Sequence, residues 1–80
     1  MSTYTTVKNR ILVLCEEKHM SINKLATESG ISASTLKSIL YGKSKNPGIV
    51  TIKQLCDGLD ISLYEFFDTD EFKELEQDIK

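Results

Sequence analysis

The spacing of the apolar residues constrains the fold of this chain more than any other feature. Apolar side chains recur at intervals of three and four positions, and no stretch alternates apolar and polar residues as a half-buried strand does. Glycines and serines interrupt the helical repeat often, so each helix spans only a few turns. The sequence therefore predicts a compact all-α fold of five short helices, followed by a short acidic helix at the C-terminus.

The first three predicted helices are delimited by residues with clear capping roles. The first helix is expected over residues 6–18. Ser21 and Ser32 are typical N-caps of the second and third helices, because a serine hydroxyl accepts a hydrogen bond from a free backbone amide. Gly30 and Gly42 follow these helices, and glycine adopts the left-handed conformation of a helix end without a side-chain penalty. Each helix is expected to stop at its glycine.

Capping boxes predict where the later helices begin, because two side chains three positions apart each bond the other's backbone amide. Three pairs of residues have this spacing: Thr51 with Gln54, Ser62 with Glu65, and Asp68 with Glu71. They predict the starts of the fourth, fifth and last helices. The last helix is expected over residues 70–79, with Phe72, Leu75 and Ile79 on one face.

The length of 80 residues, with 40% hydrophobic and 28% charged side chains, is typical of one globular domain. We expect this domain over residues 1–68 and an amphipathic helix or tail over residues 69–80. The longest apolar run, residues 11–15, is too short for a membrane span or a signal peptide, which favours a cytoplasmic protein with no membrane partner. Cys15 and Cys56 are expected to be reduced and buried, with a structural disulfide as the alternative.

The net charge of −2 conceals a strong asymmetry along the chain. Residues 1–53 contain eight lysines or arginines and three acidic residues, whereas residues 54–80 contain two lysines and nine acidic residues. A basic surface attracts a polyanion and an acidic surface repels it. The first part of the chain is therefore the candidate for binding nucleic acid.

The stretch LATESGISASTLKSIL in the middle of the chain has the pattern of two helices that cross near a tight turn. Ala26 offers a small side chain at the crossing, Gly30 allows the chain to reverse, and Ile31 fills the gap between the helices. Leu36 and Ile39 attach the second of these helices to the core. Its outer face is left with small, polar or basic side chains, which suit the groove of a nucleic acid. They are Ala33, Ser34, Lys37, Ser38 and Tyr41.

These residues resemble the helix-turn-helix of the phage-repressor-like regulators, the Cro and lambda-repressor type also called the XRE family. The resemblance continues through the following loop and the sequence GLDISLYEFF, and it covers residues 7–67. It implies a lambda-repressor-like DNA-binding domain. The implied function is that of a sequence-specific transcriptional regulator, a repressor that binds an inverted-repeat operator in double-stranded DNA as a homodimer.

The resemblance also implies roles for individual residues. Five residues would lie over the base edges: Ser32, Ala33, Ser34, Lys37 and Ser38. Five others would hold the DNA backbone: Ser21, Lys43, Ser44, Lys45 and Asn46. The chemistry of these residues agrees, because a lysine donates to guanine O6 or N7 and an alanine methyl packs on a thymine methyl. An ordinary solvated face is the alternative for the lysines.

Two positions depart from the family pattern. Ile22 stands where many relatives have a glutamine that binds a phosphate, so this phosphate contact is in doubt here. Cys15 and Leu40 stand where some relatives have an arginine and a glutamate that pair. We expect Cys15 and Leu40 to pack as hydrophobic residues, because replacing a buried ion pair by apolar groups is often neutral or stabilising.

Enzymatic chemistry finds no support in the sequence. It contains no zinc-protease motif, no phosphate-binding glycine loop and no pair of cysteines at metal spacing. His19 has no second ligand at metal spacing and is assigned to the turn after the first helix. We therefore expect no enzymatic activity, no cofactor and no metal site.

The acidic end of the chain has apolar residues of its own, which are candidates for a dimer or partner contact: Phe66, Phe67, Phe72, Leu75 and Ile79. The last helix either folds back on the first helix near Leu12 and Val13 or packs on a partner subunit. Two other functions stay open. One is an antitoxin or phage-type immunity regulator whose tail binds a second protein, and the other is a protein-interaction module that works through the acidic tail without binding DNA.

Overall fold

The computed structural model describes residues 2–79, and this part of the chain contains helices and no β-strand. The helices are α1 (Thr3–Glu17), α2 (Ile22–Ser29), α3 (Ala33–Leu40), α4 (Ile49–Leu59), α5 (Leu63–Phe67) and α6 (Asp70–Lys73). The predicted all-α fold is confirmed, and the two terminal residues of the predicted domain division, 1 and 80, lie outside the described range. Within that range no helix has the length and apolar character needed to cross a membrane.

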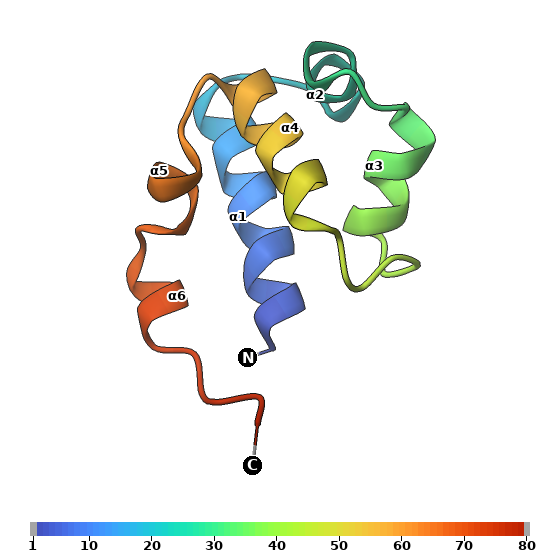
Figure 1. Cartoon of the computed structure of the whole chain (residues 1–80). Helices are drawn as coiled ribbons and strands as arrows, with labels where there is room; N and C mark the ends of the chain where they lie inside the picture. The colour runs from blue at the N-terminus through green and yellow to red at the C-terminus, as the bar shows by residue number, and fades with distance from the viewer. Residues whose placement is uncertain (1, 80) are drawn as a thin grey trace.

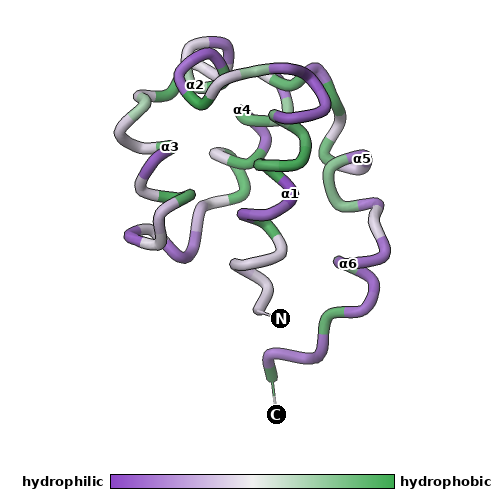
Figure 2. Tube along the Cα trace, turned by 180° about the vertical axis from the view of Figure 1, so that it is seen from behind, coloured by the Kyte–Doolittle hydropathy of each residue, from purple (hydrophilic) through white to green (hydrophobic). Residues whose placement is uncertain are grey.

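The helices enclose one hydrophobic core. α1 and α4 occupy the middle of the molecule in Figure 1 and in the opposite view of Figure 2, with α2 and α3 to one side and α5 and α6 to the other. Each of the first five helices contributes a fully buried side chain: Ile11, Leu25, Leu36, Leu55 and Phe66. The free thiols of Cys15 and Cys56 join this core, and burial raises the pKa of both. The prediction of free, buried thiols is confirmed.

The first four helices end in the same kind of turn, in which a residue with a left-handed backbone follows the helix. These residues are His19, Gly30, Gly42 and Asp60. The amide after each one bonds to the carbonyl five positions earlier: Met20 to Cys15, Ile31 to Ala26, Lys43 to Ser38, and Ile61 to Cys56. The predicted stops at Gly30 and Gly42 are confirmed, and His19 lies in the turn after α1 as expected.

Serine hydroxyls cap the helices at the predicted positions Ser21, Ser32 and Ser62. Glu65 completes the predicted capping box of α5, with both of its hydrogen bonds at 3.0 Å. α1 begins three residues earlier than predicted, because the hydroxyl of Ser2 accepts a backbone amide and caps it there. Local hydrogen bonding therefore explains why α1, α2, α3 and α5 begin where they do.

The predicted capping box at Thr51 and Gln54 is wrong. α4 begins at Ile49, and its N-cap Gly48 has an extended backbone and no side chain to accept a hydrogen bond. A proline restricts the residue before it and leaves the residues after it free to become helical. The helix therefore starts at once after the Pro47-Gly48 turn, and Thr51 lies inside its first turns.

The last helix begins at the predicted residue, Asp70, but its predicted cap and its predicted length are wrong. Thr69, and not a capping box of Asp68 and Glu71, caps α6, and this helix ends at Lys73. Acidic residues alternate with others in the segment that follows, and acidic groups near the C-terminus of a helix oppose its dipole. Ile79 is 85% exposed, so burial of its side chain does not compensate for this repulsion.

An arginine and a cluster of aromatic rings attach α5 and α6 to the rest of the molecule. The ring centroid of Phe72 lies 4.9 Å from that of Phe67 and 6.0 Å from that of Phe66. Arg10 of α1 donates from Nε to the carbonyl of Phe66 and from Nη2 to the carbonyl of Glu65, both at 2.8 Å. α6 contacts α1, so the end of the chain folds back on its own domain (Figure 1). Phe66 is fully buried and belongs to the core, so it offers no surface to a partner subunit.

Candidate nucleic-acid interface

Five residues of α3 and its C-terminal turn surround a shallow surface hollow of about 450 Å³. They are Ser34, Lys37, Ser38, Tyr41 and Lys43. Ser38 is half-buried and the other four are exposed, with Tyr41 at 67% exposure. The structure therefore brings together most of the side chains that the sequence assigned to the outer face of this helix. Their hydroxyl and ammonium groups are donors of the kind that base edges and phosphates accept.

The other two predicted base-contacting residues lie at the N-terminal end of α3, outside the lining of the hollow. The hydroxyl of Ser32 accepts the amide of Thr35 at 3.0 Å and donates to the Thr35 hydroxyl at 2.8 Å. Ala33 is half-buried and packs against the core. Ser32 is thus already engaged as a cap, while Ala33 presents only part of its methyl group to solvent.

α3 is held in place along its inner face and at both ends. Leu36 and Ile39 are buried in the core, and the turn at Gly30 connects the helix to α2. At the other end, the hydroxyl of Tyr4 in the first turn of α1 donates a hydrogen bond to the carbonyl of Ile39. Sequence reasoning missed this contact, because the two residues are 35 positions apart and no local motif connects them.

The loop after α3 is tied to the end of that helix. The amides of Lys43 and Ser44 both bond to the carbonyl of Ser38, at 3.0 and 2.9 Å. Lys45 and Asn46 are exposed and line a second hollow, which also includes the first turn of α1. The first two of the four loop residues predicted to hold the DNA backbone are therefore anchored to α3. Lys43 lines the hollow of α3, whereas Lys45 and Asn46 line the second hollow.

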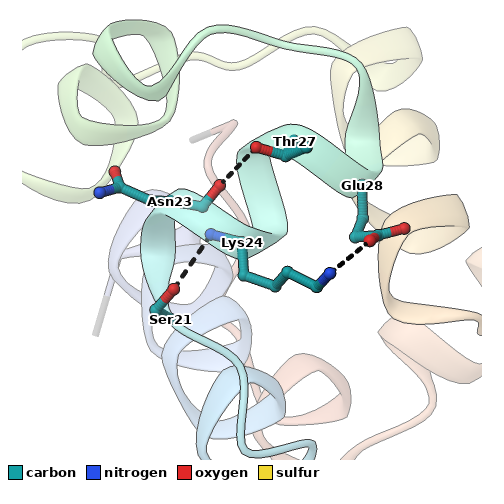
Figure 3. Close-up of polar contacts among 5 residues, drawn as sticks. All are labelled: Ser21, Asn23, Lys24, Thr27 and Glu28. Carbon is teal, nitrogen blue, oxygen red and sulfur yellow. Dashed lines mark hydrogen bonds and ion pairs between the residues drawn. The ribbon is translucent and has the colours of Figure 1, made fainter.

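The exposed side of α2 uses its polar groups within the helix itself (Figure 3). The hydroxyl of Ser21 accepts the amide of Lys24 at 3.0 Å, and the hydroxyl of Thr27 donates to the carbonyl of Asn23 at 3.0 Å. The ammonium of Lys24 lies 2.9 Å from the carboxylate of Glu28, which raises the pKa of this lysine. Ser21 therefore acts as a helix cap, and Lys24 has its charge balanced by its own helix.

The basic side chains of the α3 face differ from Lys24 in this respect. Ion pairs within residues 2–79 involve Lys24, Lys53 and Lys73. The lysines at positions 37, 43 and 45 take part in none of the ion pairs of this part of the chain. Three lysines that form no ion pair thus lie on and beside α3. An anionic ligand could bind their ammonium groups without displacing a carboxylate.

Residues 10–71 match the family model of the Cro/C1-type helix-turn-helix DNA-binding domain. The chain belongs to this family. Within the Cro/C1-type fold, α2 and α3 are the two helices of the helix-turn-helix, and the hollow described above lies on the second of them. The resemblance inferred from the spacing of Ala26, Gly30, Leu36 and Ile39 is confirmed.

Two curated proteins of Bacillus subtilis (strain 168) are similar to this Cro/C1-type chain. The HTH-type transcriptional regulator SlrR is 40% identical over 55 residues, which are 69% of this chain and 36% of SlrR. The HTH-type transcriptional repressor RghR is 40% identical over 52 residues, 65% of this chain and 38% of RghR. The chain therefore matches little more than a third of the length of either relative.

A solved structure, that of the prophage Lp1 protein 11, has the same fold. It superposes with a TM-score of 0.80 at 32% sequence identity, and the match covers 92% of this chain and 97% of the other. This likeness extends beyond the helix-turn-helix to nearly the whole chain.

The structure describes both departures from the family pattern, and the packing predicted for Cys15 and Leu40 is confirmed. Ile22 is half-buried and packs against the core. Cys15 and Leu40 are both buried in the core and pack as hydrophobic residues. At Ile22 the N-terminal turn of α2 therefore offers an apolar side chain where many relatives offer a phosphate ligand.

Proposed function

We propose that this Cro/C1-type domain is a sequence-specific transcriptional regulator whose α3 enters the major groove of double-stranded DNA. The observation that carries the proposal is the face of α3, where Ser34, Lys37 and Ser38 surround one hollow and Lys37 is free of acidic partners. The major groove of B-DNA admits an α-helix and displays a distinct pattern of acceptors and donors for each base pair.

The proposed DNA contacts divide into those that read bases, which lie on α3 and its N-cap, and those that hold the DNA backbone. Lys37 donates to guanine O6 or N7, and the hydroxyls of Ser34 and Ser38 bond to several bases. Ser32 and Ala33 lie beside them at the start of the helix, where the Ala33 methyl packs on a thymine methyl. Contacts of this kind carry the sequence information.

Phosphate contacts fix the register of the protein on the duplex without reading its sequence. We assign them to the loop after α3 and to the start of α2: Ser21, Lys43, Ser44, Lys45 and Asn46. The anchoring of the loop amides on α3 supports this assignment, because it keeps the loop lysines at a fixed position beside the helix that reads the bases.

The regulator acts on an inverted repeat as a homodimer in this proposal. A two-fold dimer places its recognition helices about one helical turn of DNA apart, roughly 34–36 Å. The dimer contact uses the partly exposed apolar residues of the acidic end, which are Phe67, Phe72, Leu75 and Ile79. The acidic residues around them favour this end as the side that faces away from the DNA.

Repression is the proposed direction of control. The relative RghR is a transcriptional repressor, and the match to it spans 65% of this chain. A phage-type immunity regulator is the second candidate, and the similarity to a prophage protein over nearly the whole chain favours it. In both cases the protein blocks transcription by occupying an operator, so the face of α3 binds DNA in the same way.

A selection of random DNA duplexes by the purified protein at physiological salt tests the proposal. We expect the wild type to enrich an inverted repeat, and Lys37→Ala to relax the preference at one position of each half-site, because one good base contact contributes about 1–3 kcal/mol of discrimination. Lys53→Ala is the matched control. It removes the same charge from α4, where the lysine is paired with Asp57, and should leave the selected sequence unchanged.

The outcomes separate the candidate functions. If the folded wild type enriches no duplex even at low salt, the DNA-binding proposal fails and the acidic tail becomes the candidate binding surface. If Lys37→Ala and Lys53→Ala weaken binding equally and leave the preferred sequence unchanged, the protein binds DNA and α3 does not read it. Binding must also weaken steeply with salt, because neutralised phosphates release counterions.

A further inference from the structure

The hydroxyl of Tyr4 connects the first turn of α1 to the C-terminal end of α3. It donates a hydrogen bond to the carbonyl of Ile39. The last four carbonyls of an α-helix have no partner within the helix and need donors from elsewhere. In α3 the turn supplies two of these donors, since the carbonyl of Lys37 accepts the amide of Tyr41 and that of Ser38 accepts the amide of Lys43. Ile39 receives its donor from a different helix.

This contact lies at the C-terminal end of α3, next to two of the five residues that surround the hollow. Tyr41 and Lys43 line the hollow and directly follow the helix, separated by Gly42, whose backbone is left-handed with φ +86°. The Tyr4 hydroxyl lies 4.0 Å from the position that a Cβ atom at Gly42 would take. The phenol group therefore rests against the turn that directs Tyr41 and Lys43 toward the hollow.

Apolar packing alone does not determine the orientation of such a helix as narrowly as a hydrogen bond does. The buried side chains of Leu36 and Ile39 attract α3 to the core, but contacts between apolar groups have no directional preference. A hydrogen bond weakens steeply when its angle departs from linearity. The Tyr4 contact therefore resists rotation and sliding of the end of α3, while the turn at Gly30 restrains its beginning.

We propose that Tyr4 is a positioning residue for sequence readout, which sets the place of the C-terminal half of α3 and of the lysine that follows it. This inference rests on the proposed DNA-binding function. α1 contributes no residue to the hollow of α3. Through Tyr4, this helix would nevertheless determine how accurately the residues around the hollow are placed against the base edges. A catalytic or binding group held even slightly out of place loses much of its effect, and the same holds for a base-reading side chain.

Tyr4→Phe tests the proposal, because it retains the ring and removes only the hydroxyl. Binding is measured to the selected operator and to a random duplex at the same salt concentration. We expect affinity for the operator to fall about tenfold and affinity for the random duplex to change less than twofold, since non-specific binding depends on the lysines and phosphates. Tyr64→Phe is the matched control. It removes the hydroxyl of a side chain that is 75% exposed on α5 and should change neither affinity.

Amide hydrogen exchange of the free protein gives a second readout that needs no DNA. In Tyr4→Phe the amides of Tyr41, Lys43 and Ser44 should exchange at least five times faster, while the amides of α2 and α4 keep their rates. Unchanged exchange at these three amides overturns the inference, as does an equal loss of operator and random binding. If the wild type binds no duplex, the proposed function fails and this inference fails with it; if the wild type binds and Tyr4→Phe has the same operator preference, only this inference fails.

Discussion

The contact between α2 and α4 and the attachment of α5 and α6 stabilise the molecule in different ways. α2 and α4 approach so closely that a Cβ atom added at Gly58 would lie 2.2 Å from the hydroxyl oxygen of Ser29 and 3.0 Å from its backbone nitrogen. Leu25 and Leu55 are fully buried in these helices. α5 and α6 have five and four residues, which is much shorter than an isolated helix needs for stability.

The difference shows how the fold separates a rigid part from an adaptable one. Close packing along α2 and α4 leaves the helix-turn-helix with little freedom, as a recognition surface requires. The C-terminal helices depend on a few polar anchors and on one cluster of rings. Damage to the first contact should therefore unfold the molecule as a whole, whereas damage to the second should stay local.

Gly58→Ala should have the largest effect, because it places a methyl group in the close contact between α2 and α4. The added methyl group overlaps both the side chain and the backbone of Ser29, and backbone atoms in a packed helix pair have little room to move. We expect a loss of about 2–3 kcal/mol in the free energy of unfolding. Urea denaturation followed by circular dichroism measures it through the midpoint.

Two variants control this experiment. Gly48→Ala adds a methyl group where no atom lies within 4 Å, so it should cost much less. Ser29→Ala should be neutral or slightly stabilising, because the Ser29 hydroxyl oxygen is buried and has no hydrogen-bond partner within the described residues. Combined with Gly58→Ala it should recover part of the loss, since the nearest atom is gone and the backbone atoms remain. A cost for Gly58→Ala no greater than that of Gly48→Ala would contradict the close-packing account.

The comparison also explains which parts of the fold the sequence could predict. Ser21, Gly30 and Ser32 act on their immediate neighbours in the chain, so local patterns predicted the ends of α2 and α3 correctly. Gly58 acts on Ser29, which is far away in sequence, and a single glycine within a helical pattern carries no signal of its partner. Close approach of two helices is thus visible only in three dimensions.

The length of the last helix was predicted wrongly for a related reason. The spacing of Phe72, Leu75 and Ile79 satisfies the helical repeat, but the repeat does not say whether a surface exists to cover it. The structure covers Phe72 with two other rings and leaves Ile79 exposed. In the candidate interface the same limit applies, since composition and spacing identified Lys37 and the loop lysines, whereas Tyr4 required knowledge of where α1 meets α3.

Arg10→Lys should have an intermediate effect confined to the C-terminal helices. The guanidinium group donates to two carbonyls of α5 at once, and a lysine ammonium keeps the charge but lacks this planar fork. We expect a loss of about 1–2 kcal/mol, as for hydrogen bonds to a charged group. Amide hydrogen exchange should accelerate in α5 and α6 and stay unchanged in α2 and α4. Equal acceleration in all four helices would show that the two regions do not behave independently.

Two shortened chains should give the smallest effects. They test where the folded domain ends and the C-terminal tail begins. A chain that ends after residue 74 retains Phe72 and loses only the acidic segment, in which Asp78 accepts one hydrogen bond from Thr3 at an exposed position; its stability should change by about 0.5 kcal/mol or less. A chain that ends after residue 68 also loses Phe72, whose half-buried ring covers Phe66 and Phe67, and should lose about 1 kcal/mol. Urea midpoints of the two chains decide between the boundaries. Equal stability of both would support the division after residue 68 predicted from the sequence, whereas a difference assigns α6 to the folded domain and leaves only the acidic segment outside it.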